Sequence, residues 1–168
     1  TPLISGWVRR SAALKALYAD NRAVVRVYGE STNAIPIEKG VCQGSILSPM
    51  LFNIFINNLP KMLRSEGAGQ GFKAYQREFT SLLFADDVCV TSATARGLQS
   101  LLDIVSKFCD RFGMEINPGK CKVIYLQAAD HRSEEVKKQA AACVYKIGGH
   151  RIEVETTETY LGVIQGVG

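Results

Sequence analysis

The sequence lacks several features that would decide its class at once. No apolar stretch approaches the ~20 residues that a membrane-spanning helix needs. Residues 1–4 show no charged leader ahead of an apolar run, so no secretion signal is expected there. Neither sign of charge dominates, because 20 Lys and Arg stand against 16 Asp and Glu, a formal charge of +4. This mildly basic balance permits a polyanionic partner without requiring one.

Internal repeats and low-complexity tracts are also missing. Hydrophobic residues make up 46% of the chain and charged residues 21%, which is an ordinary globular composition. A length of 168 residues suits one domain or part of one.

The cysteines give no sign of a zinc site. No two of them have the short spacing that structural zinc sites prefer, and neither histidine completes such a pattern. The five cysteines are Cys42, Cys89, Cys109, Cys121 and Cys143. Reduced, mostly buried thiols in an intracellular protein are therefore expected.

The first quarter of the chain predicts a helix and a hairpin. Residues 6–19 have apolar side chains at helical spacing. Residues 22–28 alternate as a strand does, residues 29–33 are typical of a turn, and residues 34–38 return as a second strand.

The next pattern is a loop followed by a helix. Gly40 to Ser45 is punctuated by glycine. Ser48-Pro49 is a strong helix start, because serine caps free amides and proline fits the first turn. Apolar spacing extends this helix to about Arg64, and residues 65–71 form a Gly-rich break.

The second half alternates hairpins with helices. An apolar run over residues 79–91 precedes a helix that stops at Gly113. Short strands are expected at residues 114–117 and 120–126, around a Pro118-Gly119 turn. Residues 130–142 are polar and suggest a helix, and Gly148-Gly149 within residues 144–155 marks another hairpin. Without repeated strand–helix–strand units, this order predicts an α+β fold.

Asp86 and Asp87 are the most informative pair. They interrupt the apolar run, where two adjacent carboxylates cost folding free energy through repulsion and partial desolvation. A hairpin tip would expose both, and a bound divalent cation would offset their charge, since hard oxygen ligands suit magnesium. On these residues alone, an ordinary Asp-Asp turn explains the pair equally well.

The loop before the Ser48 helix also suggests a binding site. Gly40 and Gly44 allow close approach of another molecule to the backbone, and Gln43 offers both a donor and an acceptor. A tight loop without a ligand is the simpler alternative.

Together the two segments resemble the reverse transcriptase family, in its non-LTR retrotransposon and group II intron branch. One family motif is present as Gln43-Gly44, Leu47-Ser48-Pro49 and Leu51-Phe52, and the catalytic hairpin motif as Phe84-Ala85-Asp86-Asp87. Two later motifs follow in the family's order, Gly113 to Asn117 with Lys120, and Tyr160-Leu161-Gly162.

The resemblance implies RNA-directed DNA synthesis by two-metal nucleotidyl transfer, with two Mg²⁺ ions or, as the alternative, Mn²⁺. Asp86 would be a metal ligand with Asp87 beside it, and Lys120 would steady or protonate the departing pyrophosphate. Residues near the nucleotide and template would be Gln43, Gly44, Ser48, Pro49, Phe84 and Ala85. Tyr160, Leu161 and Gly162 would support the primer. The implied partners are an RNA template, a DNA primer and deoxynucleoside triphosphates, with no membrane.

The implied fold is a polymerase palm whose antiparallel sheet packs against helices. Residues 1–168 would be a partial palm, incomplete at its N-terminus, because the family's other metal-binding aspartate belongs on a strand before residues 6–19. Fingers, thumb and any endonuclease region would lie elsewhere in the parent chain, and the fragment alone would be inactive. The location would be intracellular, and nuclear for a eukaryotic element. A non-catalytic reverse-transcriptase-like module that binds RNA or a protein partner is the alternative.

Overall fold

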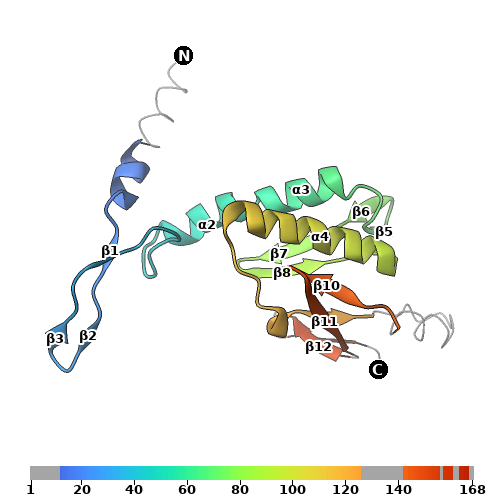
Figure 1. Ribbon diagram of the computed structural model, residues 1–168. Helices are drawn as coiled ribbons and strands as arrows, with labels where there is room; N and C mark the ends of the chain where they lie inside the picture. Colours follow the sequence, from blue (N-terminus) through green and yellow to red (C-terminus); the bar gives the residue numbers. More distant parts are fainter. Residues whose placement is uncertain (1–11, 126–141, 156, 161–162, 167–168) are drawn as a thin grey trace, which may run out of the picture. The chain divides into compact units, whose positions relative to one another are not determined.

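The structure is a computed structural model that describes residues 12–125, 142–155, 157–160 and 163–166, with side chains up to residue 155 (Figure 1). The chain divides into two compact units, residues 1–48 and residues 49–168.

The first unit contains a helix and a long hairpin. Residues 12–18 are helical, within the helix expected over residues 6–19. Strand β1 (Arg22–Ala23) pairs with β4 (Ile35–Pro36), and β2 (Arg26–Val27) pairs with β3 (Glu30–Ser31), both antiparallel. The expected hairpin is therefore confirmed.

The details of this hairpin differ from the expectation. The turn is Tyr28-Gly29, with φ of 49° and 87°, and not residues 29–33. Paired left-handed residues match the twist of two-residue hairpin loops. The strand expected over residues 22–28 is interrupted, because the Thr32 hydroxyl accepts a hydrogen bond from the Val25 amide (3.1 Å) and replaces a regular ladder contact.

The helix expected from Ser48 to Arg64 is two helices. α2 (Ser48–Ile56) ends before Asn57, and α3 (Asn58–Glu66) continues two residues past the expected end. Pro60 explains the break, because it has no amide hydrogen for the Ile56 carbonyl and fits only the first turn of a helix. The expectation of one continuous helix was therefore wrong.

The longest helix is α4 (Ala95–Phe112). Its N-cap Thr94 accepts a hydrogen bond from the Gly97 amide at 3.0 Å. Gly113 ends it with φ of 62°, a left-handed conformation that glycine adopts without steric cost. The expected helix end at Gly113 is confirmed.

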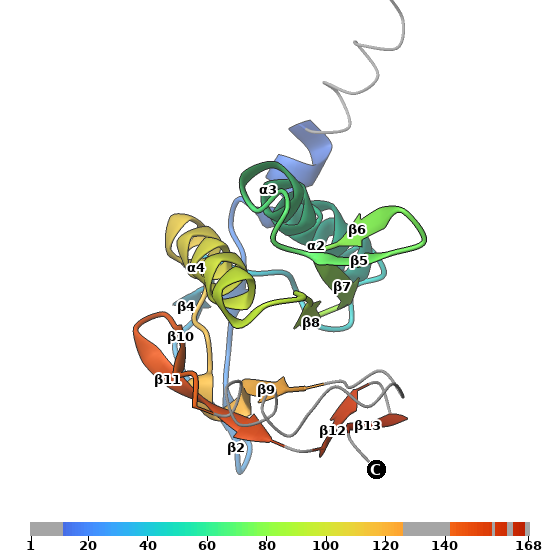
Figure 2. The ribbon, with the colours of Figure 1, turned by 90° about the vertical axis from the view of Figure 1, so that its right-hand side faces the viewer.

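The core of the second unit lies on the inner face of α4. This helix packs against α3 on one side and against strands β8 (Asp87–Val90) and β10 (Tyr145–Ile147) on the other (Figure 2). The largest fully buried side chains are Leu59, Leu63, Leu101, Phe108 and Tyr145. This core fixes the helices against the strands that carry the candidate site.

A hairpin that the sequence did not predict follows α3. β5 (Phe72–Ala74) pairs with β6 (Arg77–Phe79) around Tyr75-Gln76, whose φ angles are 48° and 60°. Such a turn favours glycine or asparagine, and neither is present here. The sequence therefore carried no turn signal at this point.

Glu78 fastens this hairpin to the chain ahead of it. Its carboxylate accepts hydrogen bonds from the amides of Gly71 (2.7 Å) and Gly69 (3.1 Å). Both hydrogen bonds lower the pKa of Glu78 below its usual 4.5, and the bond from Gly71 has the larger effect.

This pKa shift predicts a loss of stability in acid that depends on Glu78. A lowered folded-state pKa stabilises the fold above the unfolded pKa, and the gain disappears as pH falls through the folded value. The thermal midpoint of unfolding is measured at neutral pH and at a pH below 4.5. We expect acidification to lower this midpoint less in Glu78→Gln than in the parent. Glu115→Gln, a change at an exposed carboxylate, is the control. Equal acid sensitivity of parent and Glu78→Gln would contradict the prediction.

The strand expected at residues 114–117 is absent. The Met114 amide donates to the Cys109 carbonyl (2.9 Å) and closes α4, and the Asn117 side chain accepts from the Gly119 amide (3.1 Å). With these groups engaged locally, the segment connects α4 to the short helix η1 (Pro118–Lys120). The next expected strand is present as β9 (Lys122–Ile124), and residues 126–141, where a helix was suggested, lie outside the described residues.

The last expected hairpin is confirmed. β10 (Tyr145–Ile147) and β11 (His150–Glu155) pair around Gly148-Gly149, whose φ angles are 55° and 80°. β11 also pairs with β9, and this pair is parallel.

One ion-pair cluster lies on that parallel pair. The Lys122 ammonium contacts Glu153 at 2.8 Å and Glu155 at 3.1 Å. Beyond it, β12 (Thr157–Tyr160) and β13 (Val163–Gly166) form an antiparallel hairpin. Helices packed on small, mostly antiparallel sheets confirm the α+β class, with β9–β11 as the parallel exception.

Candidate active site

The paired aspartates lie at a hairpin tip, as predicted. β7 (Ser81–Phe84) pairs with β8 (Asp87–Val90) in a register that joins Phe84 to Asp87. Ala85 and Asp86 are therefore the two loop residues, and Asp87 opens the second strand.

The loop has an unusual backbone at Ala85. Its φ of 51° is left-handed, which costs a residue with a Cβ on the order of 1 kcal/mol. Two-residue hairpin loops need a left-handed residue, and glycine would supply it without strain. The tip is a tight two-residue loop that leaves both Asp86 and Asp87 exposed.

Side chains alternate along the two strands, and this alternation determines which of them face the core and which face solvent. Leu83 and Val90 pack against the core. Phe84 and its cross-strand partner Asp87 lie on the opposite face, where Phe84 is 64% exposed. The core thus anchors one face of the hairpin, and the other presents an acidic tip beside an aromatic ring.

Among the described residues, none engages the carboxylates of Asp86 and Asp87. Within the described ranges, no hydrogen bond or ion pair of either side chain is present. The described residues also contain no group of three or more His, Cys, Asp and Glu side chains that could enclose a metal ion. The hairpin therefore offers two hard oxygen donors, which is part of a magnesium ligand set. All five cysteines are free, as expected for thiols, and only Cys109 is fully buried.

The Gln43-Gly44 loop belongs to the first unit. Both residues are exposed, and Gly44 has φ of 85°. Helix α2 begins at Ser48, as expected, and the Ser48 hydroxyl donates to the Cys42 carbonyl at 2.5 Å. That bond closes the loop on itself and fixes Gln43 between its two ends. A common face for this loop and Asp86 stays a prediction.

The remaining candidates lie in the second unit. Lys120 is exposed at the end of η1, and among the described residues no ion pair involves its ammonium. The neighbouring Lys122, in contrast, is held by two glutamates. Pro49 is exposed in the first turn of α2. Tyr160 lies in β12, and Leu161 and Gly162 lie outside the described residues.

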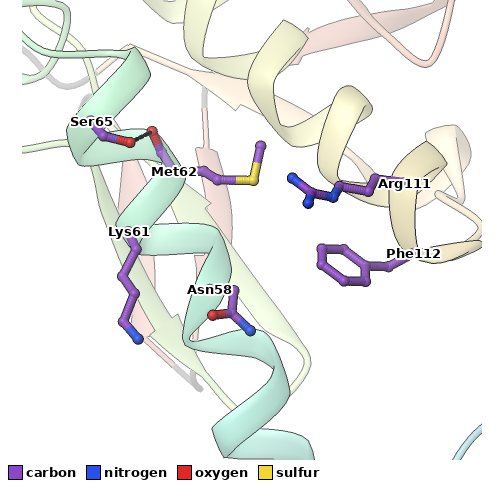
Figure 3. A pocket seen from close by; sticks show the side chains of 6 residues that line it. All are labelled: Asn58, Lys61, Met62, Ser65, Arg111 and Phe112. Atoms are coloured by element: carbon purple, nitrogen blue, oxygen red, sulfur yellow. Dashed lines mark hydrogen bonds between the residues drawn. The ribbon is translucent and has the colours of Figure 1, made fainter.

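The structure also has a hollow that the sequence did not predict. A hollow of about 450 Å³ lies between α3 and the end of α4 (Figure 3). It is lined by Asn58, Lys61, Met62, Ser65, Arg111 and Phe112. Met62 and Phe112 showed only helical apolar spacing in the sequence, and that pattern did not distinguish a lining residue from a core residue.

Among the described helices, none is both long enough and apolar enough to cross a membrane.

Comparison with known proteins identifies the family. A model of the reverse transcriptase (RNA-dependent DNA polymerase) family matches residues 5–164. A Pol polyprotein from the type-1 retrotransposable element R2 of Popillia japonica is 35% identical over 64% of this chain and 18% of its own length. The corresponding polyprotein of the type-2 element R2DM of Drosophila melanogaster is 37% identical over 59% of this chain and 9% of its own.

A third relative is a probable RNA-directed DNA polymerase from transposon BS of Drosophila melanogaster, 30% identical over 64% of this chain and 12% of its own length. The chain thus spans between 9% and 18% of the length of these relatives. The match of the family model to nearly the whole chain places this chain in the reverse transcriptase family, in its non-LTR retrotransposon branch.

Proposed function

We propose that this chain carries the nucleotidyl-transfer site of a retrotransposon RNA-directed DNA polymerase. The observation that carries the proposal is the β7–β8 tip, where Asp86 and Asp87 are exposed without a protein partner among the described residues. Two adjacent free carboxylates repel each other, and a structural turn needs at most one of them. Family membership supplies the reaction for which such a pair is suited.

Divalent magnesium fits the donor set, because both groups are hard carboxylate oxygens. When bound, two such ions activate a primer hydroxyl and neutralise the triphosphate with its leaving group. Asp86, in the loop itself, would hold metal, and Asp87 would add charge from the adjacent strand. Two ions need more oxygen ligands than one turn provides, so a further carboxylate from a neighbouring strand belongs to the proposal.

The other residues are assigned to binding and positioning. Gln43 and Gly44 would approach the incoming nucleotide and its template base, with Ser48 and Pro49 fixing the loop that presents them. The exposed ring of Phe84 would contact the nucleic acid beside the metals, held by the turn at Ala85.

Lys120 would act on the departing pyrophosphate. An ammonium without a carboxylate partner is available to neutralise phosphate oxygens or to donate a proton. Tyr160, Leu161 and Gly162 would support the primer end. The partners in this proposal are an RNA template, a DNA primer and deoxynucleoside triphosphates. The proposed site of action is intracellular, and nuclear in a eukaryotic host.

Primer extension tests the proposal. A polypeptide that contains this chain together with an upstream aspartate-bearing strand and fingers region is expected to extend a DNA primer on an RNA template with Mg²⁺. A matched reaction without template gives the background. Binding of RNA without any synthesis, under conditions where a related enzyme is active, would favour a non-catalytic module and reject the polymerase assignment.

The 168-residue chain by itself is expected to give no extension product above background. The reason is the ligand count, because adjacent residues on one turn cannot surround two ions and the described residues contain no third ligand beside them. The same primer, template and metal are used for chain and longer polypeptide. Robust synthesis by the chain alone would show that the catalytic carboxylates lie elsewhere.

A further inference from the structure

The hollow between α3 and α4 contains two cations and no acid. Lys61 comes from α3 and Arg111 from the last turn of α4, and all six lining residues lie in the second unit. Neither cation has an ion-pair partner in the part of the chain that the structure describes. A volume of about 450 Å³ lies within the usual range of ligand-binding clefts.

Helix stability does not explain both cations. Arg111 lies at the C-terminal end of α4, where the helix dipole favours a positive charge. Lys61 is the fourth residue of α3, close to the positive end of that helix dipole, where a cation is unfavourable. Figure 3 shows the Lys61 side chain directed away from Arg111, so the two cations offer separate positions for anionic groups.

The hollow also presents flat and apolar surface. The Phe112 ring is 39% exposed, and the Arg111 guanidinium carbon lies 5.7 Å from its centroid. Figure 3 shows Met62 pointing from α3 toward these two side chains. An aromatic ring beside a guanidinium plane is a surface on which a nucleic-acid base can stack.

Two hydrogen-bond acceptors complete the lining. The Asn58 amide nitrogen donates to the Phe55 carbonyl (3.0 Å), and no described residue donates to its Oδ1. The Ser65 hydroxyl donates to the Met62 carbonyl (3.2 Å) and keeps lone pairs to accept. The hollow thus offers donors from Lys61 and Arg111, and acceptors from Asn58 and Ser65.

We propose that this hollow binds a single-stranded nucleic acid, with the base of one nucleotide against Phe112, its phosphate at Arg111 and a neighbouring phosphate of the strand at Lys61. A nucleotide supplies acceptors on its phosphate, donors on its base and a flat ring, and so matches every part of the lining. An acidic peptide would engage the two cations but leave the acceptors and the ring unused. The proposal rests on the proposed function in taking nucleic acid as the partner.

Binding of short labelled single strands to the 168-residue chain tests this site, measured by fluorescence anisotropy over a range of salt concentrations. Loss of both cations in Lys61→Gln with Arg111→Gln is expected to weaken binding about tenfold and to reduce the salt slope by about 1.4. Phe112→Leu is expected to weaken binding about fivefold or more through lost base stacking. Arg64→Gln and Lys107→Gln are matched controls, since both cations lie exposed on the same helices and outside the lining.

Asn58→Asp keeps the test decisive if Phe112→Leu fails to fold. It adds a carboxylate to the lining at the first residue of α3, where an acid favours the helix, so folding is retained and binding is expected to fall about tenfold. Circular dichroism checks the fold of each variant. RNA and DNA strands of one sequence are compared. Tighter binding of RNA would indicate that the site takes the template, and tighter binding of DNA that it takes a DNA strand.

Two results would overturn the site. The first is wild-type affinity and salt slope in the double cation variant. The second is an unchanged affinity in folded Phe112→Leu together with equal displacement by polyglutamate, which would indicate a general anion surface. Primer extension reports on the catalytic assignment and strand binding reports on this site, so failure of one and failure of the other give different results.

Discussion

Asp86→Asn is expected to lower the rate of primer extension by about a thousandfold in a polypeptide that carries the complete site. The change keeps the size of the side chain and removes the charge on which metal binding depends. A thousandfold loss corresponds to about 4 kcal/mol of transition-state free energy. Because Asp86 is exposed in a two-residue loop, its replacement leaves the core packing of the unit unaltered.

Two variants separate this effect from a general loss of charge. Asp110→Asn makes the same chemical change at an exposed position on α4 and is expected to keep full activity. Asp87→Asn is expected to reduce synthesis less than Asp86→Asn, since Asp87 is assigned the secondary role. Rates are measured with saturating nucleotide at several Mg²⁺ concentrations. An Asp86→Asn rate within a few fold of the parent would remove this residue from the metal site.

Phe108→Ala is expected to lower the free energy of unfolding by about 3–5 kcal/mol. Phe108 is 0% exposed, and its ring centroid lies 5.8 Å from that of Phe55 and 4.7 Å from that of Phe112. Truncation would open a cavity between α4 and the helices before it and would remove both ring contacts.

Phe72→Ala is the matched control for that truncation. Phe72 lies on an edge hairpin and is 49% exposed, so its loss is expected to cost no more than about 1 kcal/mol. Urea unfolding followed by circular dichroism measures both variants. Equal destabilisation by the two would show that α4 does not form the core of the folded unit.

The sequence predicted elements whose signals are local. Gly113 ends α4, and Gly148-Gly149 turns the last hairpin, because glycine reaches left-handed conformations without cost. The hairpin tip at Asp86 was also predictable, since two acids inside an apolar run belong where water can reach them. Each of these predictions depended on a few neighbouring residues.

The features that were missed depend on context. The Tyr75-Gln76 turn adopts left-handed angles that neither residue prefers, so nothing in its sequence distinguished it. Pro60 was visible in the sequence, but the apolar spacing on either side of it concealed the helix break. The parallel pairing of β9 with β11 joins residues far apart in the chain, and periodicity does not report partners.

Only part of the candidate site could be predicted from the sequence. The chemistry of Asp86 followed from residue type and position, but the left-handed Ala85 that fixes it did not. The hollow at Arg111 was also invisible, because its residues come from two helices and only their packing brings the cations together.

The parallel pairing of β9 and β11 has a consequence for biosynthesis. Lys122 pairs in register with Glu153, so β9 has left the ribosome 31 residues before its partner strand does. At about 5–20 residues per second, this interval is roughly 2–6 seconds. During that time the backbone of β9 is an open strand edge without its ladder partner, available to chaperones or to another nascent chain. Translation speed over this stretch would therefore affect the yield of folded protein without any change in its sequence.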